Sequence, residues 1–148
     1  MSDEELIEKA KATRGNAYAP YSQFKVGAAI LGKSGKVYTG ANVENSSYGL
    51  TVCAERVALY CAVSQGEREF VKLALVTDRE EPAIPCGACC QALSEFNPDM
   101  EIICANLQGI TKKITLKRLL PNFFRIESPP TGRGFKPEPN RDPEASSE

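Results

Sequence analysis

Residues 70–107 read FVKLALVTDREEPAIPCGACCQALSEFNPDMEIICANL, and this stretch decides the fold. The segments Phe70–Val76 and Met100–Leu107 are almost continuously apolar, which is typical of strands that are buried on both faces. Between them, Gly87–Phe96 follows Pro85 and is predicted to form a short helix. A strand, a helix and a second strand in this order predict a right-handed parallel crossover.

The chain before this stretch predicts a helix and a hairpin. Ser2 and Glu5 have the spacing of a capping box, which opens a helix at the N-terminus. Apolar residues alternate with others from Phe24 to Ile30, which predicts a strand. The turn residues Gly32–Gly35 then connect it to a returning strand over Val37–Val43.

The remaining segments define the domain and its end. Thr51 is predicted to be the N-cap of a helix that carries Cys53, Val57 and Cys61 on one face, and residues 116–120 are predicted to form a short helix. We expect one α/β/α domain over residues 1–127. Residues 128–148 are rich in proline, glycine, serine and charge, so we expect a flexible tail.

Composition narrows the class of protein. The chain has 148 residues, a net charge of −1, six cysteines and no histidine. The near balance of acidic and basic residues disfavours a protein that tracks a nucleic-acid backbone. No segment looks like a signal peptide or a membrane span. We therefore expect a cytoplasmic protein, whose cysteines serve a metal or catalysis rather than disulfides. Without imidazole, a zinc site must use thiolates and a proton carrier must be another group.

Two cysteine motifs predict a zinc centre. Residues 51–56 read TVCAER and residues 85–89 read PCGAC. Cys86 and Cys89 have the spacing to hold one zinc ion from the first turn of a helix, and Cys53 supplies a third ligand. Three protein ligands leave a fourth position for water, which is the arrangement of a catalytic site.

The residues after Cys53 predict the chemistry. A ligand followed two residues later by glutamate, and then by P-C-x-x-C, is the signature of zinc deaminases, in which the glutamate carries protons. Glu55 occupies that position here. Three thiolates give the centre a net negative charge, and we expect Arg56 to offset it.

Two other interpretations stay open. Cys61, Cys90 or Cys104 could complete a four-cysteine structural site, or these three could be ordinary core residues. Alternatively, the chain could be an interaction module that zinc stabilises. Zinc removal would then cost the whole fold rather than activity alone.

The chain resembles the small, homotetrameric class of cytidine deaminases. The resemblance covers nearly all of residues 4–124. Four segments carry it: YSQFKVGAA at 21–29, GANVEN at 40–45, CAER at 53–56 and PCGAC at 85–89. It implies a three-layer α/β/α sandwich with a mixed central sheet of about five strands. It also implies one Zn²⁺ per chain on Cys53, Cys86 and Cys89.

The resemblance also implies a substrate site. Phe24 would pack against the pyrimidine, Asn42 and Glu44 would bind the sugar hydroxyls, and the Ala54 backbone would hold the exocyclic amino group. Taken alone, Phe24 could be a core residue, and Asn42 and Glu44 could form a turn.

Neighbouring subunits complete the site in similar enzymes. Tyr48 and Phe124 stand where such contributions are expected, although Phe124 could instead cover the core. Cys90 departs from the family, whose members commonly have arginine there, and the resemblance does not extend to the 128–148 tail.

The expected activity is zinc-dependent hydrolysis of cytidine and deoxycytidine to uridine and deoxyuridine plus ammonia, in pyrimidine salvage. An editing deaminase of nucleic acid would need a basic channel, which the sequence lacks. A nucleotide substrate would meet Glu44, which repels phosphate. The sequence leaves open the preference for ribose or deoxyribose, and a specialised cytosine nucleoside as substrate.

Overall fold

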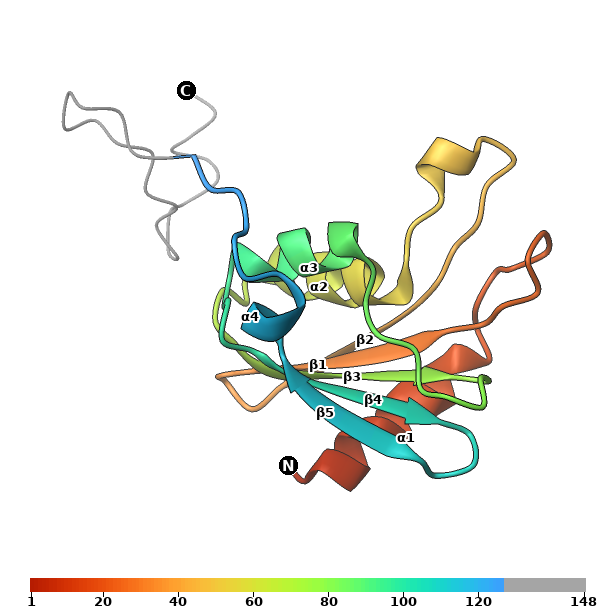
Figure 1. The fold of residues 1–148 in the computed structure, drawn as a ribbon, viewed down its shortest axis with the longest axis horizontal. Helices are drawn as coiled ribbons and strands as arrows, with labels where there is room; N and C mark the ends of the chain where they lie inside the picture. Colours follow the sequence, from red (N-terminus) through yellow and green to blue (C-terminus); the bar gives the residue numbers. More distant parts are fainter. Residues whose placement is uncertain (127–148) are drawn as a thin grey trace, which may run out of the picture.

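A five-stranded mixed sheet forms the centre of the computed structural model, which describes residues 1–126 (Figure 1). The strands are β1 (Gly27–Gly32), β2 (Val37–Ala41), β3 (Phe70–Thr77), β4 (Glu101–Asn106) and β5 (Thr111–Thr115). They lie in the order β2-β1-β3-β4-β5. Strands β3 and β4 are parallel, and the other neighbours are antiparallel. The predicted parallel pair is therefore confirmed.

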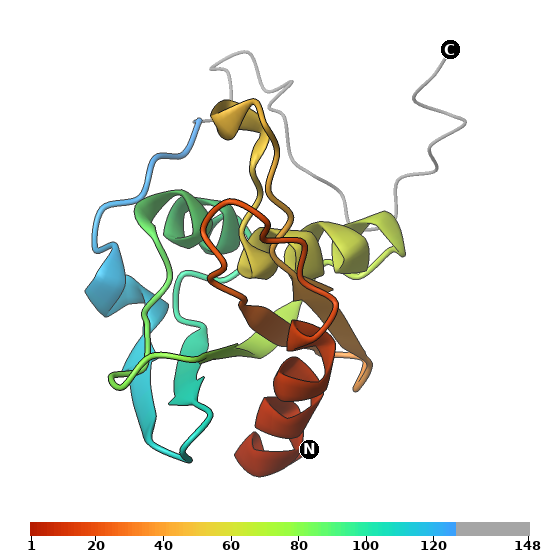
Figure 2. The same ribbon diagram turned by 90° about the vertical axis from the view of Figure 1, so that its right-hand side faces the viewer.

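Helices cover both faces of the sheet. Helix α1 (Asp3–Arg14) lies on one face, and α2 (Ala54–Ser64), α3 (Gly87–Ser94) and the short α4 (Leu116–Leu119) lie on the other (Figures 1 and 2). The three-layer α/β/α sandwich is thus confirmed. None of the helices within residues 1–126 combines the length and the apolar character that a bilayer crossing requires.

The central strands are buried because a hydrophobic cluster lies on each face of the sheet. Ala28 and Ile30 of β1 pack towards α2, whereas Ala29 and Leu31 pack towards Leu6 of α1. Because both faces are covered, every residue of β1 is buried. Apolar burial on this scale is the main stabilising contribution to the fold.

Glycine 40 sets the position of α2, the helix that begins at the zinc motif. A Cβ atom at Gly40 would lie 2.4 Å from the backbone nitrogen of Ala58 and 2.8 Å from the carbonyl oxygen of Ala54. Only a residue without a side chain permits the helix to approach β2 so closely.

The capping box of Ser2 and Glu5 is confirmed, but two predicted boundaries are wrong. The first strand begins at Gly27 rather than Phe24. The carbonyl oxygen of Phe24 and the N–H of Val26 bond to the side chain of Asn42 rather than to the backbone of a neighbouring strand.

The N-cap of α2 is Cys53 rather than Thr51. Thr51 instead accepts a hydrogen bond from the backbone of Asn45 within the loop that leads to the helix. The sequence also gave no sign of β5, an exposed edge strand without apolar alternation. The predicted tail, residues 128–148, lies outside the described residues.

Candidate metal centre and pocket

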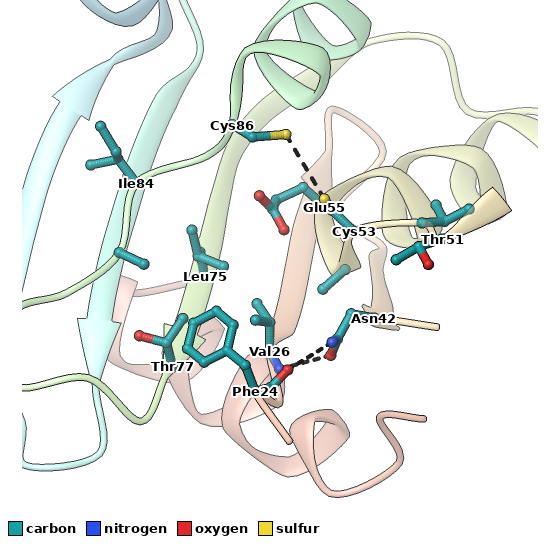
Figure 3. Close-up of a pocket in the computed structure, with 13 residues that line it drawn as sticks. Phe24, Val26, Asn42, Thr51, Cys53, Glu55, Leu75, Thr77, Ile84 and Cys86 are labelled. Carbon is teal, nitrogen blue, oxygen red and sulfur yellow. Dashed lines mark hydrogen bonds between the residues drawn. The ribbon is translucent and has the colours of Figure 1, made fainter. Parts of the chain in front are cut away.

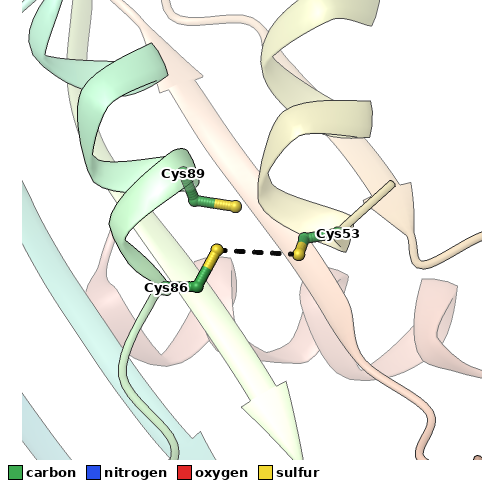
Figure 4. A group of neighbouring side chains, drawn as sticks. All are labelled: Cys53, Cys86 and Cys89. Atoms are coloured by element: carbon green, nitrogen blue, oxygen red, sulfur yellow. Dashed lines mark hydrogen bonds between the residues drawn. The ribbon is translucent and has the colours of Figure 1, made fainter. Parts of the chain in front are cut away.

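Three cysteine side chains meet where α2 and α3 begin (Figure 4). Cys53 is the N-cap of α2, and Cys86 is the N-cap of α3. Cys89 lies one turn into α3. Their Sγ atoms all lie within 4.8 Å of one another, and those of Cys53 and Cys86 are 3.8 Å apart.

These distances fit a zinc ion. Tetrahedral zinc binds thiolate sulfur at about 2.3 Å, so two sulfurs on one ion lie roughly 3.8 Å apart. The three-cysteine cluster therefore fits one zinc per chain and leaves the fourth position of a tetrahedral ion without a protein ligand.

The surroundings of Cys53 favour its thiolate form. A hydrogen bond from Cys89, aided by Arg56, lowers the pKa of Cys53 to about 5. Arg56 Nη2 donates to Cys53 Sγ over 3.6 Å, and its buried Nε has no partner among the described residues. The same hydrogen bond to Cys53, together with burial, raises the pKa of Cys89. Because thiolates are the zinc ligands, metal binding would release the proton of Cys89.

The other three cysteines lie apart from this cluster. Cys104 is buried in the core, and Cys61 accepts a hydrogen bond from Gln65. Cys90 points towards the carbonyl oxygen of Pro85. Within residues 1–126, therefore, no fourth cysteine completes a structural zinc site.

Glu55 lies beside the cysteine cluster with its carboxyl group in a pocket (Figure 3). The residue is only 5% exposed. Burial raises the pKa of its carboxyl group to about 7. A carboxyl group whose pKa lies near neutrality is suited to both take up and release a proton.

The pocket itself has a volume of about 190 Å³. Six of the residues that the sequence singled out line it, namely Phe24, Asn42, Cys53, Ala54, Glu55 and Cys86. The other lining residues are Val26, Thr51, Val52, Leu75, Thr77, Ala83 and Ile84. The pocket is thus apolar with a few polar groups, as small-molecule sites usually are.

The side chain of Asn42 forms hydrogen bonds with two other residues of the pocket wall. Its Nδ2 donates to the carbonyl oxygen of Phe24 at 2.8 Å, and its Oδ1 accepts from the backbone N–H of Val26 at 2.8 Å. Each bond uses only one of the two donor or acceptor positions of the amide. Asn42 can therefore hold the segment that leads into β1 and still offer one donor and one acceptor to a ligand.

Glu44 lies outside the lining of this pocket. Its carboxylate accepts hydrogen bonds from the backbone N–H groups of Tyr21 and Ser22, at 3.0 and 3.1 Å, and from the Ser22 hydroxyl. The hydroxyl bond holds the pKa of Glu44 below its usual range. Glu44 is thus a negatively charged group that shapes the loop before Phe24.

The two aromatic residues expected at neighbouring sites do not line the pocket of their own chain. Tyr48 lies at the tip of the loop that contains η1 (Tyr48–Leu50) and is 81% exposed. Figures 1 and 2 show this loop rising from the body of the fold. Phe124 is 72% exposed.

Two contacts near the site were not predicted. The guanidinium of Arg79 lies 4.6 Å from the centre of the Phe24 ring. Gln91, the second residue after the motif PCGAC, bonds to the backbone of Phe124. No local sequence motif indicates either contact, because each joins segments that are far apart in sequence.

Comparison with known proteins decides the family. The sequence model described as "Cytidine and deoxycytidylate deaminase zinc-binding region" matches residues 1–106. The chain belongs to the cytidine and deoxycytidylate deaminase family.

Relatives in this family match over most of their length. A cytidine deaminase of Halalkalibacterium halodurans is 50% identical over 128 residues, covering 86% of this chain and 97% of that protein. The crystal structure of a cytidine deaminase from Burkholderia pseudomallei aligns with a TM-score of 0.81 at 48% identity, covering 84% of this chain and all of that chain. A blasticidin-S deaminase of Bacillus cereus is 32% identical over 129 residues, covering 82% of this chain and 91% of that protein.

Proposed function

We propose that this protein catalyses the zinc-dependent hydrolytic deamination of cytidine and deoxycytidine, in pyrimidine salvage. One observation carries the proposal. The buried carboxyl group of Glu55 lies beside the cluster of Cys53, Cys86 and Cys89, in a pocket whose opposite wall is Phe24 and Asn42 (Figure 3).

The residues of the pocket divide the chemistry between them. Cys53, Cys86 and Cys89 would hold a zinc ion, which when bound would lower the pKa of a water molecule. Glu55 takes a proton from the attacking water and delivers it to N3 of the cytosine ring as oxygen adds to C4. Glu55 then carries the second proton to the departing amine, so that uridine or deoxyuridine and ammonia are formed.

The other residues hold the substrate. Phe24 packs against the pyrimidine, and the backbone of Ala54, the first residue of α2, holds the exocyclic amino group. Asn42 and Glu44 bind the sugar hydroxyls, which the unused donor and acceptor positions of the Asn42 amide support. The negative charge of Glu44 disfavours a phosphate on the sugar.

Arg56 offsets the charge of the thiolates. Its hydrogen bond to Cys53 supports this role, and so does the lack of a second cation from α3, where Cys90 follows the ligand Cys89. The N-termini of α2 and α3 add positive potential at the same point.

We further propose that the protein is a cytoplasmic homotetramer in which Tyr48 and Phe124 complete the pockets of neighbouring subunits. The pocket of one chain, about 190 Å³, is smaller than the roughly 300–1,000 Å³ of most ligand sites. Large apolar side chains such as Tyr48, Leu50 and Phe124 are exposed in the single chain. The six free cysteines suit a reducing compartment.

An ultraviolet absorbance assay tests the activity directly. The purified protein, with its zinc content measured, is assayed against cytidine, deoxycytidine, cytosine, dCMP and blasticidin S. Loss of the cytosine chromophore with cytidine and deoxycytidine supports the proposal. Turnover of dCMP or blasticidin S alone would contradict it. Sedimentation velocity tests the tetramer in the same preparation.

A further inference from the structure

The side-chain amide of Gln91 forms two hydrogen bonds with the backbone of Phe124, one with its carbonyl oxygen and one with its N–H. Gln91 Nε2 donates to the carbonyl oxygen of Phe124 at 2.7 Å, and the N–H of Phe124 donates to Gln91 Oε1 at 2.9 Å. The amide thus pairs with one residue as a neighbouring strand would. Two bonds to one residue fix the direction of its backbone as well as its position.

The next residue is fastened to the same helix. Arg125 Nη2 donates to the carbonyl oxygen of Glu95 at 2.8 Å and lies 3.7 Å from the Glu95 carboxylate. Gln91 and Glu95 are four residues apart, so their side chains lie on one face of the helical segment. The segment that carries Phe124 therefore runs along α3 and is attached at two successive turns.

This attachment orders a side chain that its own chain leaves in solvent. Phe124 is 72% exposed although its backbone is held by two short hydrogen bonds. Ordering a backbone costs conformational entropy, and an exposed aromatic ring gains its packing energy only against a partner.

Gln91 has no other evident task. It lies two residues after Cys89, yet it does not line the pocket, and both ends of its amide bond to Phe124. We propose that Gln91 is the positioning residue that presents the Phe124 ring to the pocket of a neighbouring copy of this chain. This inference rests on the assembly proposed above, in which Phe124 completes that pocket.

A fluorescent reporter tests the proposal without relying on activity. The chain contains no tryptophan, so Phe124→Trp introduces a single one. In the oligomer we expect its emission to be blue-shifted and protected from acrylamide, because the neighbouring pocket encloses it. Adding Gln91→Met, which keeps the length but removes both hydrogen bonds, should shift the emission to the red and increase quenching.

Gln65→Met is the matched control, because Gln65 lies at the end of α2 and, within the described residues, its side chain bonds only to Cys61. This change should leave the emission unaltered. Gln91→Glu is a second variant that keeps one acceptor for the Phe124 N–H and should give an intermediate shift. A tryptophan already exposed with Gln91 intact, or an emission that Gln91→Met and Gln91→Glu leave unchanged, would overturn the proposal.

A double-mutant cycle on the KM for cytidine gives an independent readout. We expect Gln91→Met to raise KM about two- to tenfold, the range that loss of one aromatic contact produces, with kcat changed less. In the Phe124→Ala background the same change should have almost no further effect. Equal effects in both backgrounds would show that Gln91 acts independently of the ring. Absence of cytidine turnover would contradict the proposed activity, and the tryptophan readout would still decide the role of Gln91.

Discussion

The two ends of the substrate site are built in opposite ways. At the zinc end, Cys53, Cys89 and Glu55 come from the starts of two helices, and Glu55 is 5% exposed. At the other end of the site in the proposed assembly, Tyr48 lies on a projecting loop and Phe124 on a segment that is bonded to α3, and they are 81% and 72% exposed. One chain thus holds the cysteine cluster and the carboxyl group of Glu55, whereas the rings of Tyr48 and Phe124 are exposed and, in the proposed assembly, contact a neighbouring chain.

The largest effect is expected from a change of zinc ligand. Cys86→Ala should abolish zinc binding and turnover, because two thiolates do not replace the three-ligand site. Cys61→Ala, Cys90→Ala and Cys104→Ala should keep the metal, since these residues lie outside the cluster. Metal analysis of the four purified variants checks this. Loss of zinc from any of the last three would mean that the zinc end includes other residues.

Glu55→Gln should separate chemistry from structure at the zinc end. The amide keeps the shape of the side chain but cannot carry a proton, and general acid–base catalysis is worth about 10²–10⁴-fold in rate. We expect a fall in kcat of this order, with zinc content and sedimentation unchanged. Turnover close to that of the unaltered protein would remove Glu55 from the mechanism.

Asn42 lies between the two ends and should affect both stability and sugar recognition. Asn42→Ala leaves the carbonyl oxygen of Phe24 and the N–H of Val26 without their side-chain partner, which costs about 1–3 kcal/mol per buried group in the free energy of unfolding. Glu44→Ala should destabilise less, because its loop is exposed. Urea unfolding measures these changes.

Both substitutions should also reduce turnover of cytidine more than turnover of free cytosine, which has no sugar hydroxyls to bind. Parallel assays on the two compounds check this. Equal losses on both compounds would assign Asn42 and Glu44 to folding alone.

The smallest effect is expected beyond residue 127. A chain that stops after Glu127 retains Phe124, so it should keep its oligomeric state, its zinc content and its KM for cytidine. Steady-state kinetics of the shortened chain check this. A large increase in KM would show that residues 128–148 take part in enclosing the substrate.

Motifs within a single element were predictable from the sequence, whereas contacts between distant segments were not. The capping box of Ser2 and the cysteine spacing of residues 85–89 are local patterns, and the structure contains the first and groups the second with Cys53. The two hydrogen bonds between the Gln91 side chain and the Phe124 backbone join residues 33 positions apart, so no local pattern could indicate them.

Other errors have a similar cause. Alternation predicts a strand over Phe24, but the carbonyl oxygen of Phe24 bonds to the side chain of Asn42, 18 positions away, and its N–H bonds to the Ser22 hydroxyl. Strand β5 was missed because an exposed edge strand carries little apolar pattern. The exposure of Tyr48 could be known only after folding, because its value depends on what packs around the loop.

Subunit mixing tests the contrast between the two ends most directly. Glu55→Gln chains lack the proton carrier but retain Phe124, and Phe124→Ala chains retain the zinc end but lack the ring. When the two variants are dissociated together and reassembled, sites with an intact Glu55 can receive Phe124 from a neighbour. We predict that the mixture regains cytidine turnover with the KM of the unaltered protein. Activity equal to the sum of the two variants measured separately, at the KM of Phe124→Ala, would contradict the account.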